Sequence, residues 1–129
     1  RFDLKQITGT VPIIKAYAGM GIGDGIISLL APEKIDGVVI EALGAGNLPP
    51  LAAREIKSLM DKGVPVVLVS RCFNGIAEPV YAYEGGGVKL QEAGVMFIKE
   101  LNAPKARLKL LIALSAGLEG QELKDYIEG

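Results

Sequence analysis

Five polar or aromatic side chains follow the apolar runs of the sequence, and these are the groups that could contact a small ligand. They are Asn47, Ser70, Arg71, Tyr81 and Tyr83. Amide, hydroxyl and guanidinium groups can hydrogen-bond a polar molecule, and aromatic rings can cover it. The chain contains no histidine, which excludes Ser–His catalysis, Cys–His catalysis and histidine-ligated metal sites within it. The set therefore predicts ligand binding and no catalytic or metal site.

The candidate nucleophiles lack a partner that would activate them. Cys72 follows Arg71 at the end of a predicted strand, a place where a thiolate can be stabilised. With no histidine in the chain, an inert thiol is the better interpretation. Thr8 and Thr10 offer hydroxyl groups, but no base is visible beside them in the sequence. We therefore assign no catalytic residue.

A glycine-rich stretch at residues 19–25 follows one predicted strand and precedes a short predicted helix, as a dinucleotide-binding turn does. Glu41 stands about 20 residues later, where a ribose-binding acid would be expected. The G-x-G-x-x-G spacing fails, however, since its third glycine position is occupied by Asp24 or Ile26. An aspartate there would also repel a pyrophosphate. A plain turn is favoured, and nucleotide binding stays an alternative.

Four short apolar runs predict the strands that position these side chains, and they lie at 11–17, 37–43, 64–70 and 94–98. Their β-branched content and glycine or proline boundaries are typical of strands buried on both faces. Helical patterns are predicted at 25–31, 51–62, 103–116 and 121–128. Asn102 is the predicted N-cap of the third of these helices. Lys105, Arg107 and Lys109 are expected on its outer face, and residues 76–93 are expected to form one irregular loop.

This order of elements predicts the fold class. Strands alternating with helices favour an α/β fold, here a four-stranded parallel sheet with helices on both faces, similar to a small Rossmann or flavodoxin domain. Residues 1–129 are expected to form a single domain, of which residues 1–10 are a linker. The loops after the first three strands emerge at one edge of the sheet, where ligands of such sheets bind.

Composition narrows the function classes. The net charge of −1 gives no electrostatic footprint for nucleic acid or for an anionic membrane. No apolar run approaches the roughly 20 residues of a membrane span. A single cysteine excludes an internal disulfide and fits a reducing compartment. Because the chain opens on Arg1 and not on methionine, we expect it to be cut from something larger.

The sequence resembles the C-terminal domain of the L-asparaginases over nearly its whole length. The motifs that carry the resemblance are Val11-Pro12-Ile13-Ile14, Tyr17-Ala18-Gly19, Gly37-Val38-Val39-Ile40-Glu41, Gly44-Ala45-Gly46-Asn47-Leu48-Pro49, Gly63-Val64-Pro65-Val66-Val67, Ser70-Arg71-Cys72, Gly75, Tyr81 and Lys105-Ala106-Arg107-Leu108-Lys109-Leu110. Each motif is weak alone, but their order and spacing together are specific.

The resemblance implies a role in a larger enzyme. Enzymes of this family hydrolyse asparagine to aspartate and ammonia through a threonine nucleophile of an N-terminal domain, and Thr8 and Thr10 do not match those motifs. The resemblance implies that the present domain needs no cofactor, supplies oligomer contacts and reaches the active site of a neighbouring protomer. The Gly-Ala-Gly-Asn motif assigns such a substrate contact to Asn47. Secreted members supply a second contact, an acid, from the loop after the third strand, where this chain instead carries Tyr81 and Tyr83.

The resemblance also implies partners and a source. The expected partners are an N-terminal asparaginase domain and a second copy of the chain in a homodimer. The tyrosine-containing loop resembles the cytoplasmic type of the family. Three asparagines and three glutamines suit a thermostable protein from a hyperthermophilic archaeon. One alternative is the matching domain of an archaeal tRNA-dependent amidotransferase subunit. Another is a non-enzymatic module that binds non-native chains through exposed apolar surface.

Overall fold

A computed structural model describes residues 4–16, 31–42, 47–70 and 86–129 of the chain. Its sheet has four parallel strands in the order β1-β2-β3-β4. They are β1 (Ile13–Lys15), β2 (Val38–Ala42), β3 (Val66–Ser70) and β4 (Met96–Phe97). A short 3-10 helix, η2 (Pro32–Lys34), precedes β2. The predicted parallel four-stranded sheet is confirmed.

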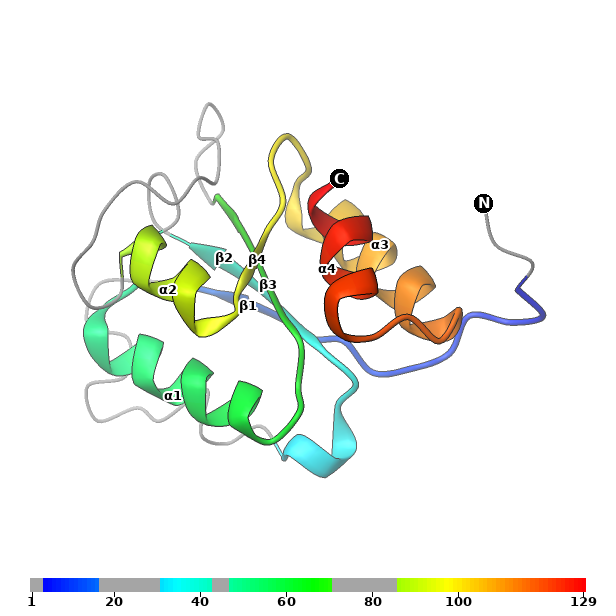
Figure 1. Cartoon of the computed structure of the whole chain (residues 1–129), viewed down its shortest axis with the longest axis horizontal. Coiled ribbons are helices and arrows are strands. Elements are labelled where there is room, and N and C mark those ends of the chain that lie inside the picture. Colours follow the sequence, from blue (N-terminus) through cyan, green and yellow to red (C-terminus); the bar gives the residue numbers. More distant parts are fainter. Residues whose placement is uncertain (1–3, 17–30, 43–46, 71–85) are drawn as a thin grey trace.

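Helices cover both faces of this sheet, as predicted (Figure 1). The helix predicted at 25–31 lies outside the described residues, apart from its last position. One face carries α1 (Pro50–Asp61) and α2 (Gly87–Ala93), and the other carries α3 (Ala103–Ser115) and α4 (Gly120–Glu128). Successive strand residues point to opposite faces, so Ile40 packs toward α1 while its neighbour Val39 packs toward α3. Apolar residues on both sides of β2 and β3 therefore build two cores. None of the described helices has the length and apolar character needed to cross a membrane.

The strands are shorter than the apolar runs that predicted them. The first strand was expected at 11–17 and forms at Ile13–Lys15, and the fourth was expected at 94–98 and forms at Met96–Phe97. Flanking residues still bond to the sheet: the amide of Val39 donates to the carbonyl of Pro12, and the amide of Ile98 donates to that of Leu68. An apolar run thus marks the buried stretch of the chain, which is longer than the part of it that forms a regular strand.

The prediction of one irregular loop at 76–93 was wrong in its last part. Residues Gly87–Ala93 form α2, which begins directly after Gly86 and ends at Gly94. Gly94 has φ +111°, a left-handed conformation that glycine adopts without steric cost. Leu90 is buried against the core and anchors the helix. The sequence did not predict this helix because its first residue belongs to a three-glycine run, a pattern typical of loops.

Helix α3 begins as predicted, but its basic face differs from the prediction. The side-chain oxygen of Asn102 accepts a hydrogen bond from the amide of Lys105 at 3.0 Å, which confirms the cap. Arg107 and Lys109 are half-buried instead of pointing outward. Arg107 donates to the carbonyl of Val11 at 2.7 Å, and Lys109 donates to the carbonyl of Ile127 at 2.9 Å. Their long side chains lie along the protein and tie α3 to neighbouring segments.

Candidate ligand-binding edge of the sheet

The carboxyl ends of three strands form the edge at which the sequence predicts ligand binding. In the register of the sheet, Lys15 lies beside Glu41, and Ala42 lies beside Ser70. Because the strands are parallel, the segments that follow Lys15, Ala42 and Ser70 all start at this edge. The sheet therefore places the segments that carry the predicted ligand-binding residues at one edge.

Asn47 is held at this edge by the residues that directly follow it. It occupies an isolated β-bridge and is half-buried. The next residue, Leu48, is 2% exposed and packs in the core against α1. Pro49 caps α1 with φ −58° and ψ 143°, and Pro50 is the first residue of the helix, a position that needs no amide donor. The backbone position of Asn47 is thus fixed by a buried anchor and a helix start that directly follow it.

The other predicted site residues fall into two groups. Ser70, which ends β3, is described and half-buried, and it lies on the strand next to the one that leads to Asn47. The others lie outside the described residues: Arg71, Cys72, Tyr81, Tyr83, and the glycines of 19–25 and 44–46. The contact assigned to Tyr81 or Tyr83 therefore stays a prediction.

Asn47 and Ser70 give the described part of this edge polar groups that can hydrogen-bond a ligand. The amide of Asn47 supplies both a donor and an acceptor, and the hydroxyl of Ser70 supplies a donor and acceptor lone pairs. Across residues 4–16, 31–42, 47–70 and 86–129, no group of three or more His, Cys, Asp or Glu side chains could hold a metal ion. The amide and the hydroxyl can therefore hydrogen-bond a polar small molecule at this edge.

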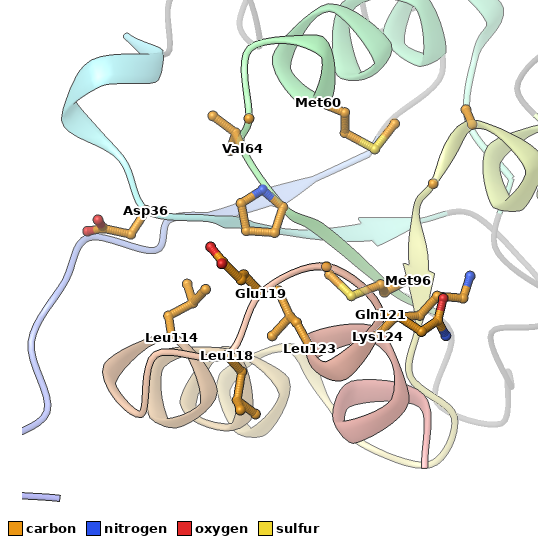
Figure 2. Close-up of a pocket in the computed structure, with 15 residues that line it drawn as sticks. Asp36, Met60, Val64, Met96, Leu114, Leu118, Glu119, Gln121, Leu123 and Lys124 are labelled. Atoms are coloured by element: carbon orange, nitrogen blue, oxygen red, sulfur yellow. The ribbon is translucent and has the colours of Figure 1, made fainter.

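A hollow of about 500 Å³ lies at the opposite, amino edge of the sheet and was not predicted from the sequence. Figure 2 shows its apolar side chains, with Asp36 at one end, Gln121 and Lys124 at the other, and Glu119 between them. Met60 and Met96 contribute thioethers to this lining. Its residues come from several separate elements, so no local pattern in the sequence could reveal it.

Comparisons with known proteins agree with the resemblance noted above. A family model described as the Glutaminase/Asparaginase C-terminal domain matches residues 10–127. The chain is 46% identical over 114 residues to the probable L-asparaginase of Deinococcus radiodurans, covering 88% of this chain and 34% of that protein. It is 33% identical over 115 residues to a subunit of the Glutamyl-tRNA(Gln) amidotransferase of Pyrococcus furiosus, covering 88% and 25%. The crystal structure of L-asparaginase I from Vibrio cholerae superimposes with a TM-score of 0.77 at 28% identity, covering 95% and 37%.

The match covers nearly all of this chain and only part of each relative. The chain spans about a third of the length of the Deinococcus radiodurans protein, 34%, and 25% of the amidotransferase subunit. The family model leaves only the first nine and the last two residues of the chain outside its range of 10–127. The chain therefore belongs to the family of glutaminase/asparaginase C-terminal domains.

Proposed function

We propose that this chain is the C-terminal domain of an L-asparaginase, which in the whole enzyme hydrolyses asparagine to aspartate and ammonia. The observation that carries the proposal is the fixed backbone position of Asn47 at the carboxyl edge of the sheet, in a chain that belongs to the glutaminase/asparaginase C-terminal domain family. In this proposal the threonine nucleophile comes from an N-terminal domain. This domain supplies Asn47 and a tyrosine, Tyr81 or Tyr83, to the substrate, and it is inert when alone.

Asn47 serves to hold the substrate and takes no part in proton transfer. Its amide nitrogen can donate to the α-carboxylate of asparagine, and its amide oxygen can accept from the α-ammonium group. Hydrogen bonds to charged groups contribute more than neutral ones, about 1.5–3 kcal/mol. Because the backbone that carries Asn47 is anchored by Leu48 and α1, the residue is positioned before the substrate arrives, which lowers the cost of binding.

A homodimer is part of the proposal, because Asn47 is proposed to act in the active site of a neighbouring copy. Residues 8–11 approach β1 from its amino end, whereas Asn47 lies at the carboxyl edge of the sheet. A domain attached through this segment therefore starts at the end of the sheet remote from Asn47. That geometry supports contact between Asn47 and a second copy. Light scattering of the eluted peak in size-exclusion chromatography measures the oligomeric state.

The proposed setting is the cytoplasm of a hyperthermophilic archaeon. The single cysteine supports a reducing compartment. The three asparagines and three glutamines support a thermostable protein. Calorimetry of the chain tests the second point, and the proposal expects a melting temperature above about 90 °C.

The decisive experiment grafts this chain onto a catalytic partner. We expect no ammonia release from asparagine by the chain alone. We expect activity when the chain replaces the matching C-terminal third of the Deinococcus radiodurans asparaginase. The control is the Deinococcus protein cut and rejoined at the same point with its own C-terminal third. An active control beside a folded but inactive chimera would contradict the proposal.

Two variants of the chimera test the assigned contact. Asn47→Ala should raise KM for asparagine about tenfold or more, because a hydrogen bond to a charged group is lost. Asn47→Asp keeps the side-chain shape but replaces the donor with an anion, so it should bind asparagine more weakly still if Asn47 faces the α-carboxylate. Equal KM values for all three proteins would remove Asn47 from the site.

The amidotransferase alternative is supported by the 33% identity to the Pyrococcus furiosus amidotransferase subunit. The same exchange, made in that protein, distinguishes the two parents. Activity in the amidotransferase background together with none in the asparaginase background would favour this alternative.

The alternative of a module for non-native chains finds less support. The exposed large apolar residues among those described are Ile7, Leu51 and Leu108. Leu51 lies on α1 and Leu108 on α3, which cover opposite faces of the sheet. These two residues therefore cannot contribute to one continuous patch, which adhesive binding requires. Failure of the chain to suppress aggregation of an unfolded protein at molar excess would exclude this alternative.

A further inference from the structure

The segment that leads into β1 is held by side chains that lie far from it in the sequence. The amide of Thr8 donates to the hydroxyl of Ser115 at 3.2 Å, and that hydroxyl donates back to the carbonyl of Thr8 at 3.1 Å. Ser115 is the last residue of α3 and lies 107 positions along the chain from Thr8. One hydroxyl thus satisfies both polar backbone groups of Thr8.

A second pair of hydrogen bonds forms two residues later. The amide of Thr10 donates to Oδ2 of Asp36 at 2.7 Å, and the amide of Asp36 donates to the carbonyl of Thr10 at 2.8 Å. Between them, Gly9 has φ +135°, and a Cβ there would lie 3.1 Å from Oδ2 of Asp36 and 3.2 Å from Cδ1 of Leu111. The positive φ therefore favours glycine, and a Cβ there would also require the two side chains to move by a few tenths of an ångström.

A third contact completes the set, which we call the tether clamp: Asp36, Arg107 and Ser115 acting on residues 8–11. Arg107 donates from Nε to the carbonyl of Val11 at 2.7 Å. All these bonds use the backbone of the segment, so they fix its path and leave the threonine hydroxyls unused by the clamp. Thr8-Gly9-Thr10, considered above as a source of nucleophiles, thus has a structural explanation.

Burial of apolar side chains does not account for the fixed conformation of residues 8–10. Residues 8–10 are exposed, and Val11 is the first buried residue of the segment. Fixing an exposed segment costs conformational entropy, and here hydrogen bonds from side chains offset that cost in place of apolar contacts.

We infer that Asp36, Arg107 and Ser115 are positioning residues, which make residues 8–11 a rigid part of this domain and so set the placement of whatever domain precedes it. This inference rests on the proposed function, in which an N-terminal catalytic domain is attached through this segment. Any hinge between the two domains must then lie before Thr8. The clamp controls how Asn47 is presented, although it acts from the opposite edge of the sheet.

Amide hydrogen exchange measured by NMR on the 129-residue chain tests the clamp independently of activity. Ser115→Ala should speed exchange of the Thr8 amide about tenfold or more while leaving that of Thr10 unchanged, because each amide has its own acceptor. Asp36→Ala should do the reverse. Ser115→Thr retains the hydroxyl, and Lys57→Ala removes only an exposed ion pair with Asp61, so both serve as controls. Free-peptide exchange rates at Thr8 and Thr10 in the unmodified chain would overturn the clamp.

The asparaginase chimera tests whether the clamp positions the domains. The Asp36→Ala/Ser115→Ala double variant should lower kcat/KM about tenfold, because small misplacements of contacting groups are costly. Its denaturation midpoint should stay close to that of the parent chimera, and the conservative Asp36→Asn/Ser115→Thr variant should keep part of the activity. An active parent with an equally active double variant would overturn the positioning role and leave the proposed function intact. An inactive parent chimera with an active rejoined control would overturn the proposed function, while the exchange experiment would still decide whether the clamp exists.

Discussion

Oε2 of Glu128 accepts a hydrogen bond from the backbone amide of Phe97 at 3.0 Å, so the last turn of α4 covers the outer side of β4. The amide of the next residue, Ile98, points the other way and bonds to the carbonyl of Leu68 on β3. Val95, two residues before Phe97, donates to the carbonyl of Leu90 at 3.0 Å. The outward amides of Val95 and Phe97 are therefore both occupied by neighbouring helices. Occupied donors protect a sheet edge from pairing with other chains.

Removing this carboxylate should destabilise the domain measurably. Phe97 is 4% exposed, and an amide that loses a charged acceptor in such surroundings costs about 1.5–3 kcal/mol. Glu128→Ala should lower the free energy of unfolding by that amount in a urea titration. Glu128→Gln keeps an acceptor oxygen and should lose less, although it also breaks the 3.5 Å contact with Lys124. Equal losses for the two variants would show that the hydrogen bond to Phe97 contributes nothing.

The N-cap of α3 gives a second prediction. The Oδ1 atom of Asn102 accepts from the amide of Lys105 at 3.0 Å. Asn102→Ala should lower the free energy of unfolding by about 1 kcal/mol, because an amide at the helix start loses its partner. Asn102→Asp keeps an oxygen at this position and should be close to neutral. Denaturant titration of the three proteins measures their free energies of unfolding. An alanine variant as stable as the unmodified chain would mean that water replaces the cap at no cost.

The sequence was sufficient to predict the sheet and the position of Asn47 at its edge, because the signals for both lie in residues that are neighbours along the chain. Runs such as Val66–Ser70 have the β-branched composition of a buried strand. The glycines before Asn47 predict a loop, and the prolines after it predict a helix start, which the structure places at Pro50. These signals depend on neighbouring residues only, so they survive without knowledge of the tertiary structure.

What the sequence could not predict depends on contacts between distant segments. The basic side chain of Arg107 resembles that of any exposed helical residue, and only packing places it beside Val11, 96 positions away. Likewise, Asp36 has the pattern of an ordinary turn residue until the fold brings Thr10 to it. Helix α2 could not be predicted because its seven residues are too few to show a helical repeat of apolar side chains, and they follow a run of glycines. The contact expected from Tyr81 or Tyr83 lies outside the described residues and stays a prediction.

Close packing at the start of β2 gives a third prediction. Gly37 is buried, and a Cβ there would lie 2.9 Å from Cδ2 of Leu110 and 3.4 Å from the carbonyl oxygen of Pro65. Gly37→Ala should therefore destabilise the domain by about 1–3 kcal/mol through overpacking. Gly63→Ala is a contrasting variant that tests backbone strain without overpacking. Gly63 has φ +89°, and a Cβ there would meet none of the described residues within 4 Å, whereas Gly37 is not among the described glycines with positive φ. If Gly37→Ala has the same free energy of unfolding as the unmodified chain, movement of the Leu110 side chain must relieve the 2.9 Å approach.

Two leucines of α3 offer the sharpest test of the packing. Leu110 is fully buried between the helix and the sheet, whereas Leu108 on the same helix is 51% exposed. Leu110→Ala removes the same atoms as Leu108→Ala and has the same effect on helix propensity, so the difference between the two variants isolates burial. We expect Leu110→Ala to lose about 2–5 kcal/mol of unfolding free energy and Leu108→Ala to change it by about 0.5 kcal/mol or less. A large loss for Leu108→Ala in the isolated chain would mean that a second copy covers this side of α3. Dilution would then reduce the loss, because the stability of an assembled form depends on protein concentration.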